Sequence, residues 1–230
     1  MEHSSANYRK KAIPQGAVAR IMRREQARLY QEFARIFPPQ RGLRILDVGT
    51  NGSLKNPEHY FLHHFHPYTT DITAAGLQSP DNFRRCYPSC DYVQVHRGEP
   101  LPFEDGAFDL VFCNAVIEHV GDRATQRSFL AELLRVGQSA FITTPNRWYP
   151  VELHTALPLL HYLPSPIWRR AYRRLGFEFF SREEHLNLLD KRQLIKLLPD
   201  DMDRPWRVHY HHFLGLPSNL LFAVAPPGVR

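Results

Sequence analysis

The stretch RILDVGTNGS, residues 44–53, decides the fold of this chain. Residues 45–48 form an apolar run with one acid, which is typical of a strand buried on both faces of a parallel sheet. Gly49 permits a turn in which a ligand can approach the backbone, because glycine has no Cβ. Burying Asp47 is costly unless a cation or a hydrogen-bond donor pairs with it. The stretch predicts either the first strand and loop of a nucleotide-type cofactor site or an ordinary strand and turn.

Composition is that of a globular protein of one α/β domain. The 230 residues, 43% of them hydrophobic, are enough for a core of ordinary size. No apolar run approaches the roughly 20 residues that cross a bilayer, and the polar N-terminus does not resemble a signal peptide. The three cysteines indicate a reducing cytoplasm, with Cys86 and Cys90 as structural thiols. A net charge of +6 favours anionic partners only weakly, and no nucleic-acid partner is expected.

Strand and helix patterns alternate along the chain, which indicates a doubly wound, mostly parallel sheet with helices on both faces. The closing pair of strands has no clear helix between its members and predicts an antiparallel hairpin at the sheet edge. The expected strands lie at residues 45–48, 68–72, 91–96, 108–113, 140–144, 206–212 and 219–225. The expected helices lie at residues 14–36, 57–65, 124–135 and 190–198.

The alternation breaks at about residues 146–180, which are rich in proline, aromatic residues and arginine. We therefore expect an N-terminal helical extension, residues 1–43, and a domain over residues 44–230 with an insertion at about 146–180. Within the insertion, Trp168, Tyr172 and Leu175 fall on one side of a helix and four arginines on the other. Residues 167–175 thus form either a helix with a solvated basic face and a packed apolar face, or a contact site. Such a site would bind an anionic membrane surface or the phosphates of an acceptor.

Three stretches, in this order, resemble motifs of the class I S-adenosylmethionine-dependent methyltransferases, in particular the type 11 group. They are ILDVG at residues 45–49, LPFEDGAFDLV at residues 101–111, and VIEHV at residues 116–120 followed by AELLRV at residues 131–136. The resemblance runs from about residue 44 to residue 145 and resumes at residues 216–220. It implies a Rossmann-like seven-stranded sheet with an antiparallel last strand, and S-adenosyl-L-methionine (SAM) as cofactor.

The resemblance also implies a set of residues around the cofactor. Asp47 would face the ammonium of the methionine part, and Asp71, at the end of the second strand, would accept hydrogen bonds from the ribose hydroxyls. After the third strand the usual Asp is missing, so either Glu99 or backbone atoms would contact the adenine. The expected cofactor-binding residues are Asp47, Gly49, Thr50, Asn51, Asp71, Ile72, Gly98, Glu99, Asn114 and Ala115.

Methyl transfer from a sulfonium mainly requires alignment of the acceptor with the methyl group. An oxygen or nitrogen acceptor that starts protonated also needs a base within hydrogen-bond reach. His119, His154 and Glu152 are the candidate catalytic residues, because they follow the fourth and fifth predicted strands. A structural role for His119 and a merely polar loop around His154 are the alternatives. No metal site is expected, because the histidine-rich pieces lack partners at metal-ligand spacing.

The leading interpretation is a methyltransferase that acts on an oxygen or nitrogen acceptor, on a small molecule or a glycan- or lipid-linked precursor. The alternative is a non-catalytic binding or scaffold protein of the same fold, favoured by Asn51 and Ser53 in place of two glycines of the family's loop. A nicotinamide-dependent oxidoreductase is disfavoured, because G-x-G-x-x-G does not follow the first strand.

Overall fold

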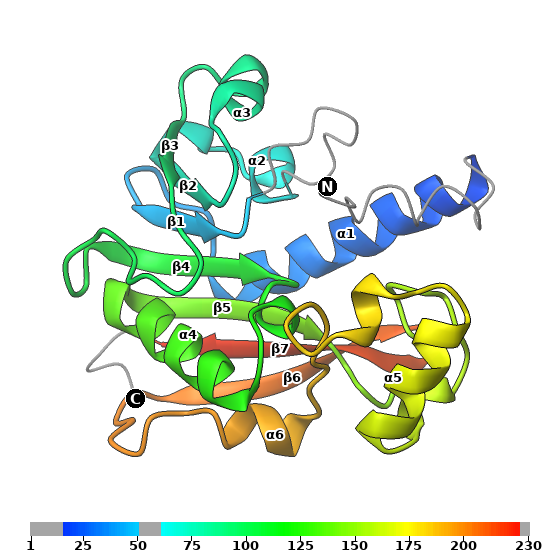
Figure 1. Cartoon of the computed structure of the whole chain (residues 1–230). Helices are drawn as coiled ribbons and strands as arrows, with labels where there is room; N and C mark the ends of the chain where they lie inside the picture. The colour runs from blue at the N-terminus through cyan, green and yellow to red at the C-terminus, as the bar shows by residue number, and fades with distance from the viewer. Residues whose placement is uncertain (1–15, 51–60, 226–230) are drawn as a thin grey trace.

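The computed structural model describes residues 16–50 and 61–225. Its centre is one seven-stranded sheet in the order β3-β2-β1-β4-β5-β7-β6 (Figure 1). Strands β1 to β5 run parallel, and β7 is antiparallel to both of its neighbours, β5 and β6. This confirms the predicted doubly wound sheet with its antiparallel last strand.

The strands are β1 (Ile45–Val48), β2 (Ile72–Gly76), β3 (Asp91–Gln94), β4 (Phe108–Asn114), β5 (Gly137–Pro145), β6 (Trp206–Phe213) and β7 (Leu216–Val224). The helices are α1 (Ala17–Ile36), α2 (Phe61–Phe65), α3 (Asp81–Cys86), α4 (Arg123–Val136), α5 (Ser165–Arg174) and α6 (Lys191–Ile195). Among the described residues, no helix is long and apolar enough to cross a membrane.

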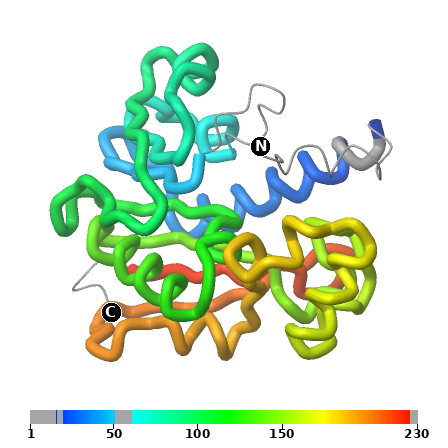
Figure 2. Tube along the Cα trace, viewed as in Figure 1, coloured from blue at the N-terminus to red at the C-terminus, as the bar shows by residue number. Residues whose placement is uncertain are grey.

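Strand β1 lies inside the sheet, between β2 and β4, and is buried along its whole length. Leu46 packs in the cluster that contains Leu130 and Leu133 of α4, whereas Ile45 packs with Phe33 of α1 on the other face. Alternate side chains of a strand point to opposite faces, so an apolar run without alternation needs cover on both. The helices on the two faces provide that cover (Figures 1 and 2).

Helix α1 is also tied to the far edge of the sheet. His211 of β6 lies 2.8 Å from Glu32 and 3.3 Å from Glu25 of α1. Together with the burial of Leu29 and Phe33, these contacts pack α1 onto the sheet. The boundary placed at residue 43 stays a prediction.

The prediction of a second strand at residues 68–72 was wrong. Residues 69–71 form a 3-10 turn, and β2 begins at Ile72 and runs through small residues to Gly76. A Cβ on Gly76 would lie 2.2 Å from the carbonyl oxygen of Thr50 and 2.4 Å from the hydroxyl of Tyr92. Strand β2 therefore needs small residues where the loop after β1 lies against it. β-Propensity does not predict this requirement, because it comes from a contact with another segment.

The insertion has a core of its own, centred on Trp168, Tyr172 and Phe180. The predicted separation of this helix into an apolar side and an arginine side is confirmed only in part. Leu175 is exposed, and Arg169 stacks over Trp168 at 4.4 Å while its guanidinium donates to the carbonyl of Leu186. Arg169 is thus part of the packing of the insertion, because its planar donors satisfy backbone carbonyls that would otherwise be unpaired.

Candidate functional site

Parallel strands place their carboxyl ends at one edge of the sheet, and ligands of open α/β sheets bind there. At this edge the chain leaves β1 at Gly49, β4 at Ala115 and β5 at Asn146. All the sequence-predicted catalytic residues follow β4 or β5. The site is therefore built from three loops over neighbouring strands.

Gly49 makes a turn that only glycine fits. Its φ is +97°, and a Cβ there would lie 2.2 Å from Cγ2 of Val116 in the loop after β4. The N–H groups of Gly49 and Thr50 both donate to the carbonyl of Ala75 in β2, at 2.8 and 3.1 Å. The loop after β1 is therefore pressed against the loop after β4, which leads to the candidate catalytic residues.

Asp47 is buried, as expected, and its partner comes from α2. His63 Nδ1 lies 3.4 Å from Asp47 Oδ2, and the His63 ring packs edge-on against Phe83. His63 could not be selected from the sequence, because nothing in the spacing of residues 47 and 63 indicates that they meet. Asp47 thus has a buried imidazole as its neighbour within the protein.

Asp71 and Ile72 are not at this edge. Because β2 begins at Ile72, they lie at the amino-terminal end of the strand, and the Asp71 carboxylate accepts the Gly42 N–H at 2.6 Å. In the sheet register Asp47 pairs with Ala74, two residues further along β2 than Ile72. The prediction that Asp47 and Asp71 share one crevice was wrong for this reason, and Asp71 caps a turn instead.

The remaining predicted cofactor residues fall in three places. Asn114 ends β4 and Ala115 follows it; Asn114 Oδ1 accepts the Thr143 hydroxyl at 2.6 Å, and Ala115 has a φ of +55°. A left-handed non-glycine residue stores roughly 1–3 kcal/mol, which is common in ligand-binding loops. Gly98 and Glu99 are exposed in the turn after β3. Asn51 lies outside the described residues.

The three predicted catalytic residues do come together. His154 Nε2 lies 3.1 Å from His119 Nε2, and His154 Nδ1 lies 2.6 Å from Glu152 Oε1. His119 Nδ1 in turn lies 2.6 Å from the carbonyl oxygen of His185. His119 is the more exposed of the two rings, so it faces any ligand at this edge, with His154 and Glu152 behind it.

Glu152 is buried and held as a carboxylate. Burial alone would raise its pKa, but hydrogen bonds from His154 and from Thr155 outweigh that effect and lower the pKa to about 2. Thr155 donates both its N–H and its hydroxyl to Oε2, at 2.8 and 2.7 Å. As a carboxylate, Glu152 can only accept hydrogen bonds, so the ring of His154 is oriented with its Nδ1–H towards Glu152.

Glu118, in the VIEHV motif, is a further residue of the site that was not among the residues predicted from the sequence. It is fully buried, and burial raises its pKa to about 7. Oε2 accepts the Thr144 hydroxyl at 3.0 Å, but among the described residues Oε1 accepts no hydrogen bond, with His119 Nε2 3.9 Å away. A buried carboxylate oxygen without a donor is rare and calls for an explanation.

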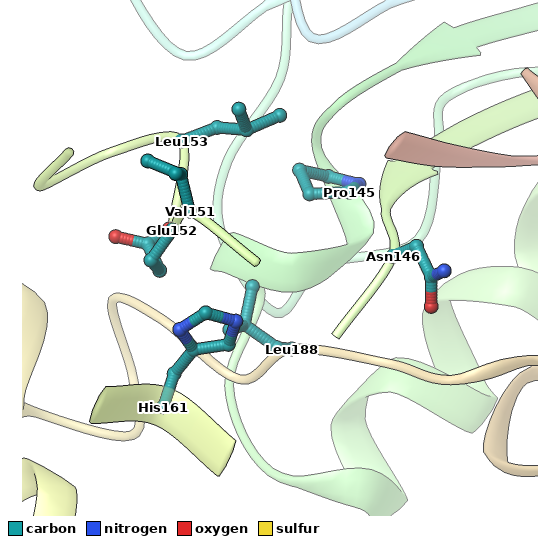
Figure 3. Close-up of a pocket in the computed structure, with 7 residues that line it drawn as sticks. All are labelled: Pro145, Asn146, Val151, Glu152, Leu153, His161 and Leu188. Carbon is teal, nitrogen blue, oxygen red and sulfur yellow. The ribbon is translucent and has the colours of Figure 1, made fainter. Parts of the chain in front are cut away.

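A small pocket of about 160 Å³ lies between the end of β5 and the insertion, and Figure 3 shows Glu152 and His161 in its wall. Essentially none of this space admits a water molecule, so it is far too small for a ligand. Its lining residues are Pro145, Asn146, Val151, Glu152, Leu153, His161 and Leu188. It is a packing gap behind the site and not the place of a cofactor.

The strand order, the glycine turn after β1 and the polar cluster after β4 and β5 define a Rossmann-like methyltransferase fold. Residues 46–140 match the model of the family described as "Methyltransferase domain". This stretch is therefore similar to the methyltransferase domain of that family, and the described part of the chain has the Rossmann-like fold of the class I SAM-dependent methyltransferases.

A curated relative, the ubiquinone biosynthesis O-methyltransferase of Aromatoleum aromaticum, is 29% identical over 119 residues, which is half of each protein. The chain thus spans about half the length of that relative.

Solved structures share the fold at lower identity. The phosphoethanolamine N-methyltransferase 2 of Haemonchus contortus, in complex with SAM, is 13% identical, with a TM-score of 0.55 over 87% of this chain and 52% of that one. The N-methyltransferase NodS of Bradyrhizobium japonicum, in complex with S-adenosyl-L-homocysteine (SAH), is 12% identical, with a TM-score of 0.51 over 89% and 87%.

Proposed function

We propose that this protein is a SAM-dependent methyltransferase that binds its cofactor over the carboxyl ends of β1 and β4. The observation that carries the proposal is the family match over residues 46–140, which spans the tight Gly49–Val116 contact. Because Gly49 has no Cβ, a cofactor can lie against the backbone of this loop, as it does in nucleotide-binding turns. The reducing, cytoplasmic setting expected from the cysteines is part of the same proposal.

The proposed cofactor residues are those at this edge of the sheet. Asp47 and Gly49 would take the methionine part of SAM, together with the backbone of Asn114 and Ala115. Thr50 belongs to the same loop, and Gly98 and Glu99 follow β3 on the adenine side. The end of β2, at Gly76 rather than Asp71, is then the strand end closest in register to the ribose.

We propose a hydroxyl oxygen as the acceptor atom. The relative from Aromatoleum aromaticum is an O-methyltransferase by name, and a hydroxyl must lose its proton as the methyl group arrives. His119, backed by His154 and Glu152, stands next to the loop that touches Gly49 and is the group placed to activate that hydroxyl. The acceptor itself is a small molecule or a lipid- or glycan-linked precursor.

The proposal is tested by transfer of a labelled methyl group. We expect the full chain to move tritium from [methyl-³H]SAM to at least one member of a panel of phenols, catechols and hydroxylated prenyl quinone precursors. His119→Asn should lower kcat by about 10²–10⁴, the range of general acid–base catalysis, while SAM affinity changes little. Binding of SAM without transfer to any panel member would favour the scaffold alternative instead.

The insertion is the proposed contact to a lipid-linked acceptor or to the membrane that carries it. Ile167, Arg170 and Arg174 lie on one face of α5 by their spacing, and all three are exposed. Further large apolar side chains of residues 146–180 are also exposed, namely Trp148, Val151, Leu153, Leu159, Leu163 and Leu175. Apolar groups beside arginine favour an anionic lipid surface.

Vesicle co-sedimentation measures this contact. We expect the chain to sediment with vesicles containing anionic phosphatidylglycerol and to lose at least about tenfold in affinity in Ile167→Asp/Arg170→Glu, since each basic residue near such a surface contributes about 1 kcal/mol. Arg127→Glu, which removes an exposed arginine of α4, is the matched control and should bind almost as wild type. Equal binding to neutral vesicles would contradict the electrostatic part.

A further inference from the structure

The cluster of Glu118, His119 and His154 has the composition of a metal site. One ligand atom from each residue, a carboxylate oxygen and two imidazole nitrogens, lies within 4.8 Å of the other two. The residues come from two separate segments, the turn after β4 and the insertion after β5, so they are brought together only by the fold.

The hydrogen bonds of the two histidines leave two lone pairs facing each other. His154 Nδ1 contacts the Glu152 carboxylate and His119 Nδ1 contacts the His185 carbonyl, and both of these oxygens can only accept. Each Nδ1 must therefore carry a proton. In neutral rings each Nε2 then presents a lone pair, and the two Nε2 atoms are 3.1 Å apart. Something positive has to lie between or beside them.

A shared proton would satisfy the two histidines but not the third group. Glu118 Oε1 is fully buried and accepts no hydrogen bond among the described residues, and it lies 3.9 Å from His119 Nε2. A single cation bound by both Nε2 atoms and by Oε1 accounts for all three groups at once. Two metal–nitrogen bonds of about 2.1 Å span 3.1 Å at an angle of about 95°, which is an ordinary ligand angle.

The groups behind these residues match those of known metal centres. Metal-binding histidines usually donate their other N–H to a carboxylate or a backbone carbonyl, which fixes the ring and its tautomer. Here Glu152 does this for His154 and the His185 carbonyl does it for His119, while Thr144 donates to the second oxygen of Glu118. The orientation of the three groups is thus fixed by their neighbours.

We propose that Glu118, His119 and His154 bind a divalent cation of the zinc or first-row transition-metal class. Two imidazoles and one carboxylate suit these metals and leave coordination positions open. This departs from the expectation of no metal drawn from the sequence. The inference rests on the proposed function for its role and changes how His119 would act there: as a ligand, His119 would act through the cation and not take the proton itself. The cation would hold the acceptor oxygen and lower the pKa of its hydroxyl, so that the proton leaves to water before the methyl group arrives.

The test measures metal binding directly, on the full chain without a histidine tag and after dialysis against a chelator. We expect calorimetric titration with ZnCl₂ to show one Zn²⁺ per chain with a Kd at or below the micromolar range. Glu118→Gln and His154→Ala should each weaken binding by at least about 100-fold. Glu152→Gln, which removes only the group behind His154, should weaken it by about 10- to 100-fold.

His209→Ala is the control, because His209 is exposed on β6 and outside the cluster, and it should bind zinc as wild type. Cobalt(II) gives a second measurement: visible absorption of a low-coordinate complex in wild type that disappears in Glu118→Gln. Circular dichroism checks that each variant is folded. Substoichiometric zinc in wild type, or equal affinity in wild type and Glu118→Gln, would overturn the metal site. SAM binding is measured separately, so a failed metal site and a failed methyltransferase assignment give different results.

Discussion

Replacing Gly49 by alanine should abolish measurable SAM binding and lower the free energy of unfolding by roughly 2–4 kcal/mol. Two effects add in this variant. The φ of +97° is unfavourable for any residue with a Cβ, and the new methyl group would lie 2.2 Å from Val116 Cγ2, so the loops after β1 and β4 must separate. Because the cofactor is proposed to lie against this turn, a shift there displaces its binding surface. Urea denaturation and calorimetric titration with SAM measure the two effects.

Gly215→Ala is the matched control for backbone strain. Gly215 has a φ of +78° in the turn between β6 and β7, but nothing lies within 4 Å of a Cβ there. It should lose only about 1–2 kcal/mol and keep its SAM affinity. If Gly49→Ala bound SAM as wild type does, the turn after β1 would not be part of the cofactor site.

Replacing Glu152 by glutamine should destabilise the protein by roughly 3 kcal/mol at pH 7, because it removes the charged partner of a buried network. The effect depends on pH with a definite sign. The folded-state pKa of Glu152 is lowered to about 2 from an ordinary value near 4.5, so its stabilisation is complete above about pH 4.5 and is lost as the pH falls towards 2. The wild-type and variant unfolding curves should therefore converge in acid.

Glu178→Gln is the control for this variant. Glu178 is an exposed carboxylate of the same insertion, in a surface pair with Arg182, and its loss should change stability by less than about 0.5 kcal/mol. Urea midpoints between pH 3 and pH 7 measure both variants. A constant difference between wild type and Glu152→Gln over this range would show that Glu152 is not held ionised by His154 and Thr155.

Most of the sheet could be predicted from the sequence, because strands and hairpins are indicated by patterns of neighbouring residues. The unalternated run at residues 45–48 and the closing hairpin both appear in the structure as predicted. The prediction of the second strand was wrong because it relied on the β-branched residues 69 and 70. In the structure the strand runs through small residues up to Gly76, because larger side chains would clash with Thr50 and Tyr92. Asp71 was misplaced with it.

The site was predictable only in part for a related reason. His119, His154 and Glu152 could be selected because each follows a strand at the carboxyl edge, and the structure brings them together. That Glu118 is buried without a donor, and that His63 meets Asp47, depends on contacts between segments far apart in the sequence. Spacing along one chain does not carry that information.

Titration of SAM, and of SAH as the product, into the purified full chain tests the central claim most directly. We expect one binding site per chain with a Kd below about 100 μM, lost in Gly49→Ala and kept in Gly215→Ala. No heat of binding at millimolar SAM or SAH, from a chain that is folded by circular dichroism, would contradict the assignment of this protein as a methyltransferase.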